Sequence, residues 1–210
     1  MAPPVITITR QYASGGSEVA RLAAKALAWT VIDNEFVDEV ARRAGLPTDE
    51  VAQIEERAPS LLERLARTLA LASPELFSGA ATPPAEPDEA RVVRVTERII
   101  TEAAAHGRAV LVGRGAQAIL AQRPDALHVY VVAPRPWRMR LAVERLGADP
   151  RTVEQTLEDV DRRRDRYVHA NYGRVRQDPA IYDLVVNAER LGIDGAAALV
   201  VAEAKRRGWG

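Results

Sequence analysis

The chain has 210 residues, which is enough for one sizeable hydrophobic core and at most two small domains. Its formal net charge is zero, so the overall charge predicts neither a nucleic-acid nor a membrane partner. The sequence contains no cysteine, which excludes disulfides and thiolate metal sites, and its 3 histidines lack the spacing of a zinc site. No apolar run approaches the roughly 20 residues that span a bilayer, and the N-terminus lacks the apolar segment of a signal peptide. We therefore expect a soluble cytoplasmic protein.

The first predicted element is a strand, residues 5–8, that runs into a glycine-bearing loop and then into an amphipathic helix. In this layout, backbone N–H groups and a helix N-terminus converge on an anion. The Ser17 hydroxyl is placed to reach a Mg²⁺ ion. The lysine of the usual motif, G-x-x-x-x-G-K-[ST], is absent, and a plain glycine-rich turn is the alternative that these residues leave open. The candidates for binding the phosphates of a nucleotide are Ala13, Ser14, Gly15, Gly16 and Ser17.

The middle of the sequence predicts a helical insertion between the second and third strands. A strand at residues 29–32 ends at Asp33, which either contacts a ligand or caps the next helix. We predict that residues 45–90 form the insertion. Its proline-rich segment, residues 78–87, is predicted to be a mobile loop, because it has no large apolar group that could pack.

The rest of the chain alternates predicted helices and strands. The third strand runs into Gly113-Arg114-Gly115, where the arginine either points into a ligand crevice or caps carbonyl groups at the sheet edge. The predicted elements are a helix at 88–105, a strand at 109–112, a strand at 127–132, a helix at 135–146, a helix at 152–169, a strand at 182–186 and a helix at 193–207.

Arginines crowd the predicted helix at residues 152–169. Its run D-R-R-R-D-R contains Arg162, Arg164 and Arg166, which form either a solvated helix face or a lid over a transferring phosphoryl group. We favour a lid over residues 152–175, because a glycine-bearing segment follows the helix and can serve as a hinge.

Strands that alternate with helices predict an α/β fold in three layers, with a five-stranded parallel sheet covered on both faces. Ligands bind such sheets at the carboxyl ends of the strands. Polar residues follow four of the predicted strands at that edge: Arg10, Asp33, Arg114 and Asn187.

The order of these segments resembles the cytidylate kinase-like family, which belongs to the P-loop nucleoside monophosphate kinases. The segments that carry the resemblance are ITITRQYASGGSEVARLAAKAL, VIDNEFVDEVA, AVLVGRG, ALHVYVVA, DRRRDRY and DPAIYDLVVNAERLGIDGA. The resemblance covers nearly the whole chain and is loose only over residues 45–88. It implies a single P-loop NTPase-type domain over residues 1–210, with a helical arginine-rich lid.

The opening loop departs from that of the better known cytidylate kinases. Arg10 and Ala13 stand where two loop glycines would be, and Gly16 stands where the lysine would be, whereas Gly15 and Ser17 match. A loop without lysine is common within the cytidylate kinase-like group itself, so the departure has the look of a subfamily trait.

The resemblance implies ATP-dependent phosphoryl transfer to a nucleoside monophosphate, with CMP or dCMP as the first choice and Mg²⁺ bound through Ser17. Arg114 would hold the acceptor phosphate, and Asp33 would border its pocket. Gly115 replaces an aspartate that follows this arginine in cytidylate kinases. The charge that the loop lysine normally supplies would come from four arginines: Arg10, Arg162, Arg164 and Arg166.

Two other functions stay open from the sequence. The missing lysine favours a catalytically weak nucleotide-binding or regulatory module, and Gly115 is consistent with a kinase of another small phosphate acceptor. The expected partners are a nucleotide and a small-molecule phosphate acceptor, not a nucleic acid or a membrane. Both a monomer and a homodimer are compatible with the sequence.

Overall fold

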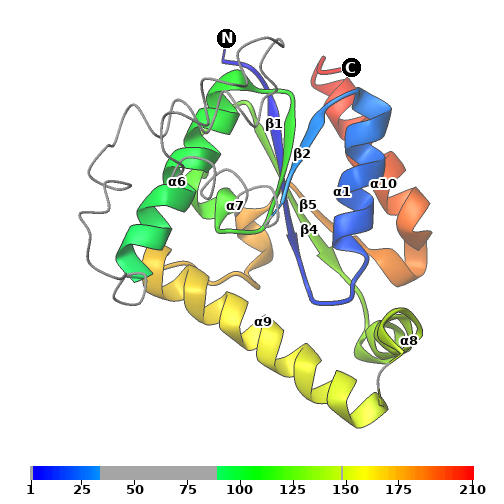
Figure 1. The fold of residues 1–210 in the computed structure, drawn as a ribbon. Helices are drawn as coiled ribbons and strands as arrows, with labels where there is room; N and C mark the ends of the chain where they lie inside the picture. The colour runs from blue at the N-terminus through cyan, green and yellow to red at the C-terminus, as the bar shows by residue number, and fades with distance from the viewer. Residues whose placement is uncertain (1, 34–88, 148) are drawn as a thin grey trace, which may run out of the picture.

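The computed structural model describes residues 2–33, 89–147 and 149–210 (Figure 1). The helices predicted within residues 34–88, the proline-rich loop at 78–87 and nearly all of the predicted insertion at 45–90 lie outside this part of the chain. Within it, strands and helices follow one another in the predicted order.

The described residues form a five-stranded sheet in which all neighbouring strands run parallel. The strand order is β2-β3-β1-β4-β5, so β1 lies in the centre and its carboxyl end has a neighbouring strand on each side. This arrangement confirms the predicted α/β fold. The strand bounds are β1 Val5–Arg10, β2 Thr30–Ile32, β3 Ala109–Val112, β4 Ala126–Val132 and β5 Leu184–Asn187.

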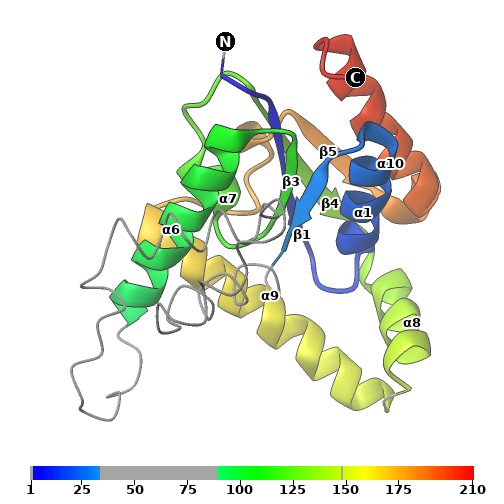
Figure 2. The ribbon, with the colours of Figure 1, turned by 45° about the horizontal axis from the view of Figure 1, so that its top comes forward.

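Helices cover both faces of the sheet, and both ribbon views show this arrangement (Figures 1 and 2). α1 and α10 lie side by side on one face, and α6 and α7 lie on the other. The long helix α9 crosses beyond the carboxyl ends of the strands, and α8 links β4 to it. The helix bounds are α1 Gly16–Leu27, α6 Glu89–His106, α7 Ala116–Ile119, α8 Arg135–Leu146, α9 Pro150–Tyr172 and α10 Ala188–Arg206.

The main core lies between the sheet and the layer of α1 and α10. Small side chains dominate the buried helix faces, with Ala20 and Ala23 from α1 and Ala196 and Ala197 from α10. Because these side chains are short, the two helices pack closely on each other and on the sheet. The strands contribute β-branched residues such as Ile8, which is 1% exposed. The start of α1 is therefore held in place by its packing on the sheet and on α10.

The closing elements differ from the predicted boundaries for local reasons. β5 begins at Leu184 instead of residue 182, because the preceding Pro179–Ile181 form a 3₁₀ helix. α10 begins earlier than residue 193, because the Asn187 side chain caps it by accepting from the N–H groups of residues 189 and 190. Gly192, with φ 70° and ψ 160°, then kinks the helix where the predicted one starts. Asn187 thus serves as a helix cap.

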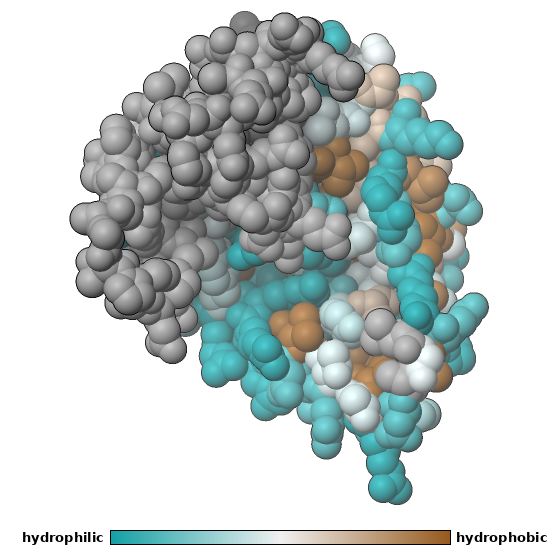
Figure 3. Space-filling view, viewed as in Figure 1, coloured by the Kyte–Doolittle hydropathy of each residue, from teal (hydrophilic) through white to brown (hydrophobic). Residues whose placement is uncertain are grey.

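The surface over α9 is mostly hydrophilic in the face that Figure 3 presents. This agrees with the exposed arginines and acidic residues of that helix. None of the helices in the described ranges combines the length and the apolar composition that crossing a bilayer requires.

Candidate functional site

The loop between β1 and α1 depends on two residues in left-handed conformation. Ala13 has φ 56° and Gly15 has φ 78°. Gly15 is the N-cap of α1 and has no side chain, so no side-chain cap occupies the first N–H groups of the helix. Residues 10–18 line a cavity of about 190 Å³ together with side chains from α8 and α9. This geometry is that of an anion-binding loop at a helix N-terminus.

The two serines of the loop have different environments. Ser14 is buried, and its Oγ lies 2.9 Å from the carbonyl oxygen of Gln11 and 3.1 Å from that of Val131. This side chain therefore anchors the loop to β4. Ser17 is exposed in the first turn of α1. The described residues contain no cluster of three or more acidic or histidine side chains that could hold a metal. Of the two hydroxyls, that of Ser17 is the one available to a ligand.

Arg10 explains why the loop has glycine, and not lysine, at position 16. A Cβ atom added to Gly16 would lie 2.4 Å from Arg10 Cβ and 3.0 Å from its Cγ. Real Cβ atoms do not approach other carbons so closely, so a lysine at position 16 does not fit while Arg10 keeps its place. The two departures from the usual motif are therefore coupled: the arginine side chain at position 10 occupies the space that a side chain at position 16 needs.

The side chain of Arg10 crosses to the end of β3. A Cβ atom added to Gly113 would lie 1.9 Å from Arg10 Nη1, so only glycine leaves room for the guanidinium. Burial, together with the nearby charges of Arg164, Arg176 and Arg114, lowers the pKa of Arg10 to about 9, whereas the charge of Asp33 opposes the shift. Arg10 Nε has no hydrogen-bond partner among the described residues. Among the described residues, Asp33 is the acidic group whose charge acts on Arg10, and a positive charge lies partly buried at this edge.

Three of the predicted strand-end residues therefore meet. Arg10 ends β1, Asp33 follows β2 and Arg114 comes shortly after β3, and these strands are neighbours in the order β2-β3-β1. The charges of Asp33 and Arg114 both act on Arg10. This is the arrangement that the strand-end pattern predicted.

Two further arginines reach this edge from α9 and from the segment after it. Arg164 Nη1 donates to the carbonyl oxygen of Arg10 at 3.3 Å, and Arg176 Nη1 donates to the same oxygen at 3.0 Å. The side chain of Arg176 is only 4% exposed, and its Nε donates to Asp165 at 2.6 Å. Burial also lowers the pKa of Arg164. We call Arg10, Arg114, Arg164 and Arg176 the arginine cluster.

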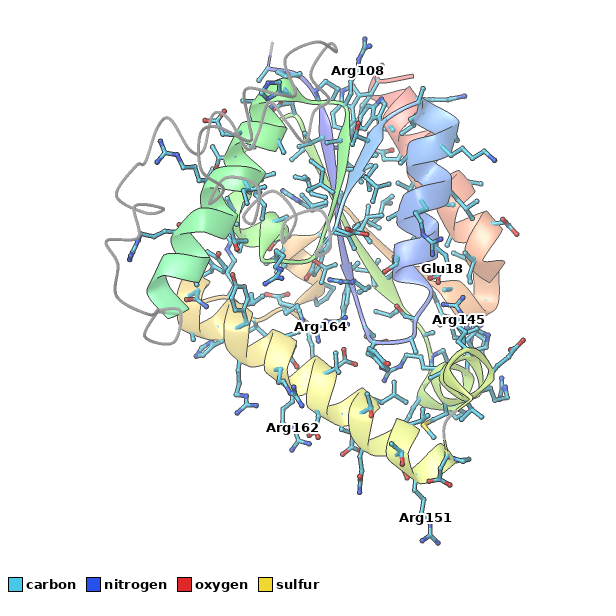
Figure 4. The ribbon with its side chains drawn as sticks, viewed as in Figure 1. Glu18, Arg108, Arg145, Arg151, Arg162 and Arg164 are labelled. Atoms are coloured by element: carbon cyan, nitrogen blue, oxygen red, sulfur yellow. The ribbon has the colours of Figure 1, made fainter. Side chains whose placement is uncertain are left out.

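The other two predicted lid arginines lie outside this cluster. Figure 4 shows Arg164 pointing from α9 toward the sheet and Arg162 pointing away from it. The side chain of Arg162 is 62% exposed and pairs with Asp159 at 3.2 Å. Arg166 is also exposed. The helical period explains the difference, because residues two positions apart lie on nearly opposite sides of an α-helix.

Asp161 joins α9 to the loop and was not predicted from the sequence. Its Oδ1 accepts from the N–H of Tyr12 at 2.9 Å, and its Oδ2 accepts from Arg138 Nη1 at 2.8 Å. Arg164 and Arg176 each lie 3.6 Å from Oδ1. Arg138 also donates to the carbonyl oxygen of Tyr12 at 3.2 Å. The signal in the sequence was an aspartate directly before the arginine run, which is the expected partner for inward-facing guanidinium groups.

The loop after β3 is closed over by the end of α9. Gly113, Arg114 and Gly115 all have positive φ, at 75°, 51° and 73°. A Cβ atom added to Gly115 would lie 2.5 Å from Cε2 of Tyr172, so the tyrosine ring occupies the space of a larger residue. Tyr172 also contacts Tyr167 edge-on, with ring centroids 6.1 Å apart. The ring of Tyr172 therefore fills the space that a side chain at position 115 would need.

A central strand that ends in an anion-binding loop, a sheet in the order β2-β3-β1-β4-β5 and an arginine-bearing helix over the strand ends together define the P-loop kinase class of folds. The chain belongs to the cytidylate kinase-like family, whose sequence profile matches residues 5–190. This membership supports a nucleotide-kinase-like function.

Solved structures share the fold at low sequence identity. A protein of uncharacterised function from Eubacterium ventriosum is 19% identical with a TM-score of 0.66, over 96% of this chain and 98% of that one. Shikimate kinase from Acinetobacter baumannii, solved in complex with shikimate, is 13% identical with a TM-score of 0.50, over 98% of this chain and 94% of that one. A comparison with curated proteins gives no significant match.

Proposed function

We propose that the protein transfers the terminal phosphoryl group of ATP to a nucleoside monophosphate, with CMP or dCMP as the first candidate acceptor. The observation that carries the proposal is the arginine cluster, which places four guanidinium groups beside the anion-binding loop. Arg176 is buried and the other three arginines are partly buried. Bringing four positive charges together partly out of water is costly in the free protein, and the cost is offset when phosphate groups bind.

The chemistry asks the protein mainly for positioning and charge neutralisation. In the transition state of phosphoryl transfer, negative charge spreads over the equatorial oxygens of the phosphoryl group. The N–H groups of residues 13–17 would hold the donor phosphates, and Ser17 would bind the Mg²⁺ ion that accompanies them. Arg114 would hold the phosphate of the acceptor, with Asp33 at the border of its pocket. The side chain of Arg10 extends from Gly16 to Gly113, and Arg164 donates to the Arg10 carbonyl oxygen, so both arginines would neutralise charge on the transferred group.

The loop after β3 bears on which acceptor the protein would bind. In cytidylate kinases an acidic residue follows the arginine that corresponds to Arg114. Here that position is Gly115, and the ring of Tyr172, from the end of α9, covers it. This feature favours a second candidate, transfer to another small acceptor that carries a phosphate.

A coupled assay of ADP formation separates these functions. The purified chain is incubated with ATP and Mg²⁺ and a panel of nucleoside monophosphates, and then with non-nucleotide phosphate acceptors. Turnover with CMP or dCMP supports the first proposal, and turnover only with a non-nucleotide acceptor supports the second. Binding of ATP without turnover on any acceptor would contradict both and would favour a regulatory nucleotide-binding module.

A further inference from the structure

Arg145 lies beside the anion-binding loop and is not among the site residues predicted from the sequence. It lies in the last turn of α8 and lines the same 190 Å³ cavity as residues 10–18. Its Nη1 pairs with Oε1 of Glu18, which is in the first turn of α1. Figure 4 shows the two side chains approaching each other from α8 and α1. A guanidinium group is therefore held at the side of the loop where α1 begins.

Arg10 from the loop and Arg164 from α9 line this cavity together with Arg145. Position 16 has no room for lysine beside Arg10. The guanidinium of Arg10 extends instead to Gly113 at the end of β3, on the side of Arg114. Glu18 adds a negative charge within the first turn of α1, which would repel the phosphates of a bound nucleotide unless a cation screens it.

We propose that Arg145 is the cation that binds the donor phosphates in place of the absent lysine, and that Glu18 positions it there before the nucleotide arrives. This inference rests on the proposed function. The side chain of Arg145 is 39% exposed, and exposed ion pairs are weak, so a phosphate group can replace the carboxylate as its partner. A planar guanidinium can bind two phosphate oxygens at once. The ion pair with Glu18 would already hold the guanidinium of Arg145 beside the loop before a phosphate binds.

A second arginine keeps Glu18 neutralised after this exchange. Arg21 Nη2 lies 3.5 Å from the same Oε1 atom, one helical turn further along α1, and its side chain is 64% exposed. When Arg145 turns to the phosphates, Arg21 remains beside the carboxylate. The carboxylate of Glu18 thus keeps an arginine partner both before and after the nucleotide binds.

The test compares the affinities of ATP, ADP, AMP and inorganic tripolyphosphate for the full chain by titration calorimetry in the presence of Mg²⁺. Arg145→Ala should weaken binding of ATP and tripolyphosphate by about tenfold or more and leave AMP affinity nearly unchanged, because one charge-assisted contact to the outer phosphates is lost. Arg145→Lys should recover part of the loss. Arg140→Ala is the matched control, because Arg140 is on the same helix, is 69% exposed and pairs at 3.5 Å with Glu189 outside the cavity.

The outcomes separate this inference from the function on which it rests. If the unaltered chain binds none of the four ligands, both fail. If it binds ATP and Arg145→Ala binds ATP equally well, only the role of Arg145 is overturned. An equal loss for AMP and ATP in Arg145→Ala, or a lowered melting temperature without ligand that Arg145→Lys does not restore, would also overturn it, since either result means a structural role.

Discussion

The carboxylate of Asp161, in the middle of the lid helix α9, accepts a hydrogen bond from the backbone N–H of Tyr12, with Oδ1 and N 2.9 Å apart. The same carboxylate binds Arg138 of α8 at 2.8 Å. One side chain therefore fixes the positions of the anion-binding loop, α8 and α9 relative to one another. It also lies 3.6 Å from two members of the arginine cluster, Arg164 and Arg176, and compensates part of their charge.

Asp161→Asn should destabilise the protein and disturb the lid. The amide can still accept from Tyr12 but no longer balances the guanidinium groups around it, so we expect the free energy of unfolding to fall by about 2 kcal/mol. Chemical denaturation checks this value. Asp159→Asn is the control, because Asp159 is on the same helix, is 54% exposed and pairs at 3.2 Å with Arg162, which points outward. Equal stability of the two variants would contradict the role given to Asp161.

Arg164 and Arg162 should differ strongly in their importance for turnover. Arg164 donates to the carbonyl oxygen of Arg10 and points toward the sheet, whereas Arg162 points away from it. Arg164→Ala should lower kcat by roughly 100-fold or more, as loss of a charge at a transferring phosphoryl group does. Arg162→Ala should change kcat less than about twofold. Similar losses in both variants would mean that the lid takes another orientation during the reaction.

The parts of the site that follow strand ends could be predicted from the sequence, because apolar strands and the polar residues after them are local patterns. Arg10, Asp33 and Arg114 meet for that reason. Arg176 and Asp161 could not be found in this way, since their contacts with the loop, to Arg10 and Tyr12, join residues more than a hundred positions apart in the chain. The contact of the Arg10 side chain with Gly16 and Gly113 is likewise a product of packing.

Gly115→Asp, which restores the aspartate of cytidylate kinases, should destabilise the protein through Tyr172. The new Cβ would meet the tyrosine ring at 2.5 Å, and the positive φ adds strain of its own. We expect a loss of about 2–4 kcal/mol in the free energy of unfolding. Gly147→Asp controls for the backbone strain, because Gly147 has φ 59° and open space around it. Adding Tyr172→Ala to Gly115→Asp should recover part of the loss. Failure of that double variant to recover would place the cost elsewhere.

His128 should make the fold sensitive to acid. It is 8% exposed on β4, its Nδ1 lies 2.8 Å from Thr7 Oγ1, and burial lowers its pKa below the ordinary 6.5. The folded protein keeps this histidine neutral, while the unfolded chain binds a proton below pH 6.5. Its contribution to stability is therefore complete above pH 6.5 and is lost as the pH falls through the lowered folded-state pKa.

Melting temperatures at pH about 7.5 and about 5 test this dependence. His128→Gln should melt lower than the unaltered chain at the higher pH, and it should lose less on acidification. His106→Gln is the control, because His106 is exposed at the end of α6. An unchanged acid response in His128→Gln would mean that other groups cause it.

Arg10→Met should raise stability and lower function at the same time. The substitution removes a buried charge whose pKa is lowered to about 9 by burial and by neighbouring arginines, while the main-chain carbonyl that Arg164 and Arg176 bind is retained. Replacing a largely desolvated charge by an apolar side chain of similar length commonly stabilises a protein, here by about 1 kcal/mol or more. The melting temperature without ligand should therefore rise.

The further rise in melting temperature that ATP and Mg²⁺ cause should be smaller in Arg10→Met, because the charge that phosphate groups would have compensated is gone. Differential scanning calorimetry with and without ATP measures both effects. A lower melting temperature in the ligand-free variant would mean that Arg10 stabilises the fold directly, and an unchanged response to ATP would mean that its charge does not act on the nucleotide.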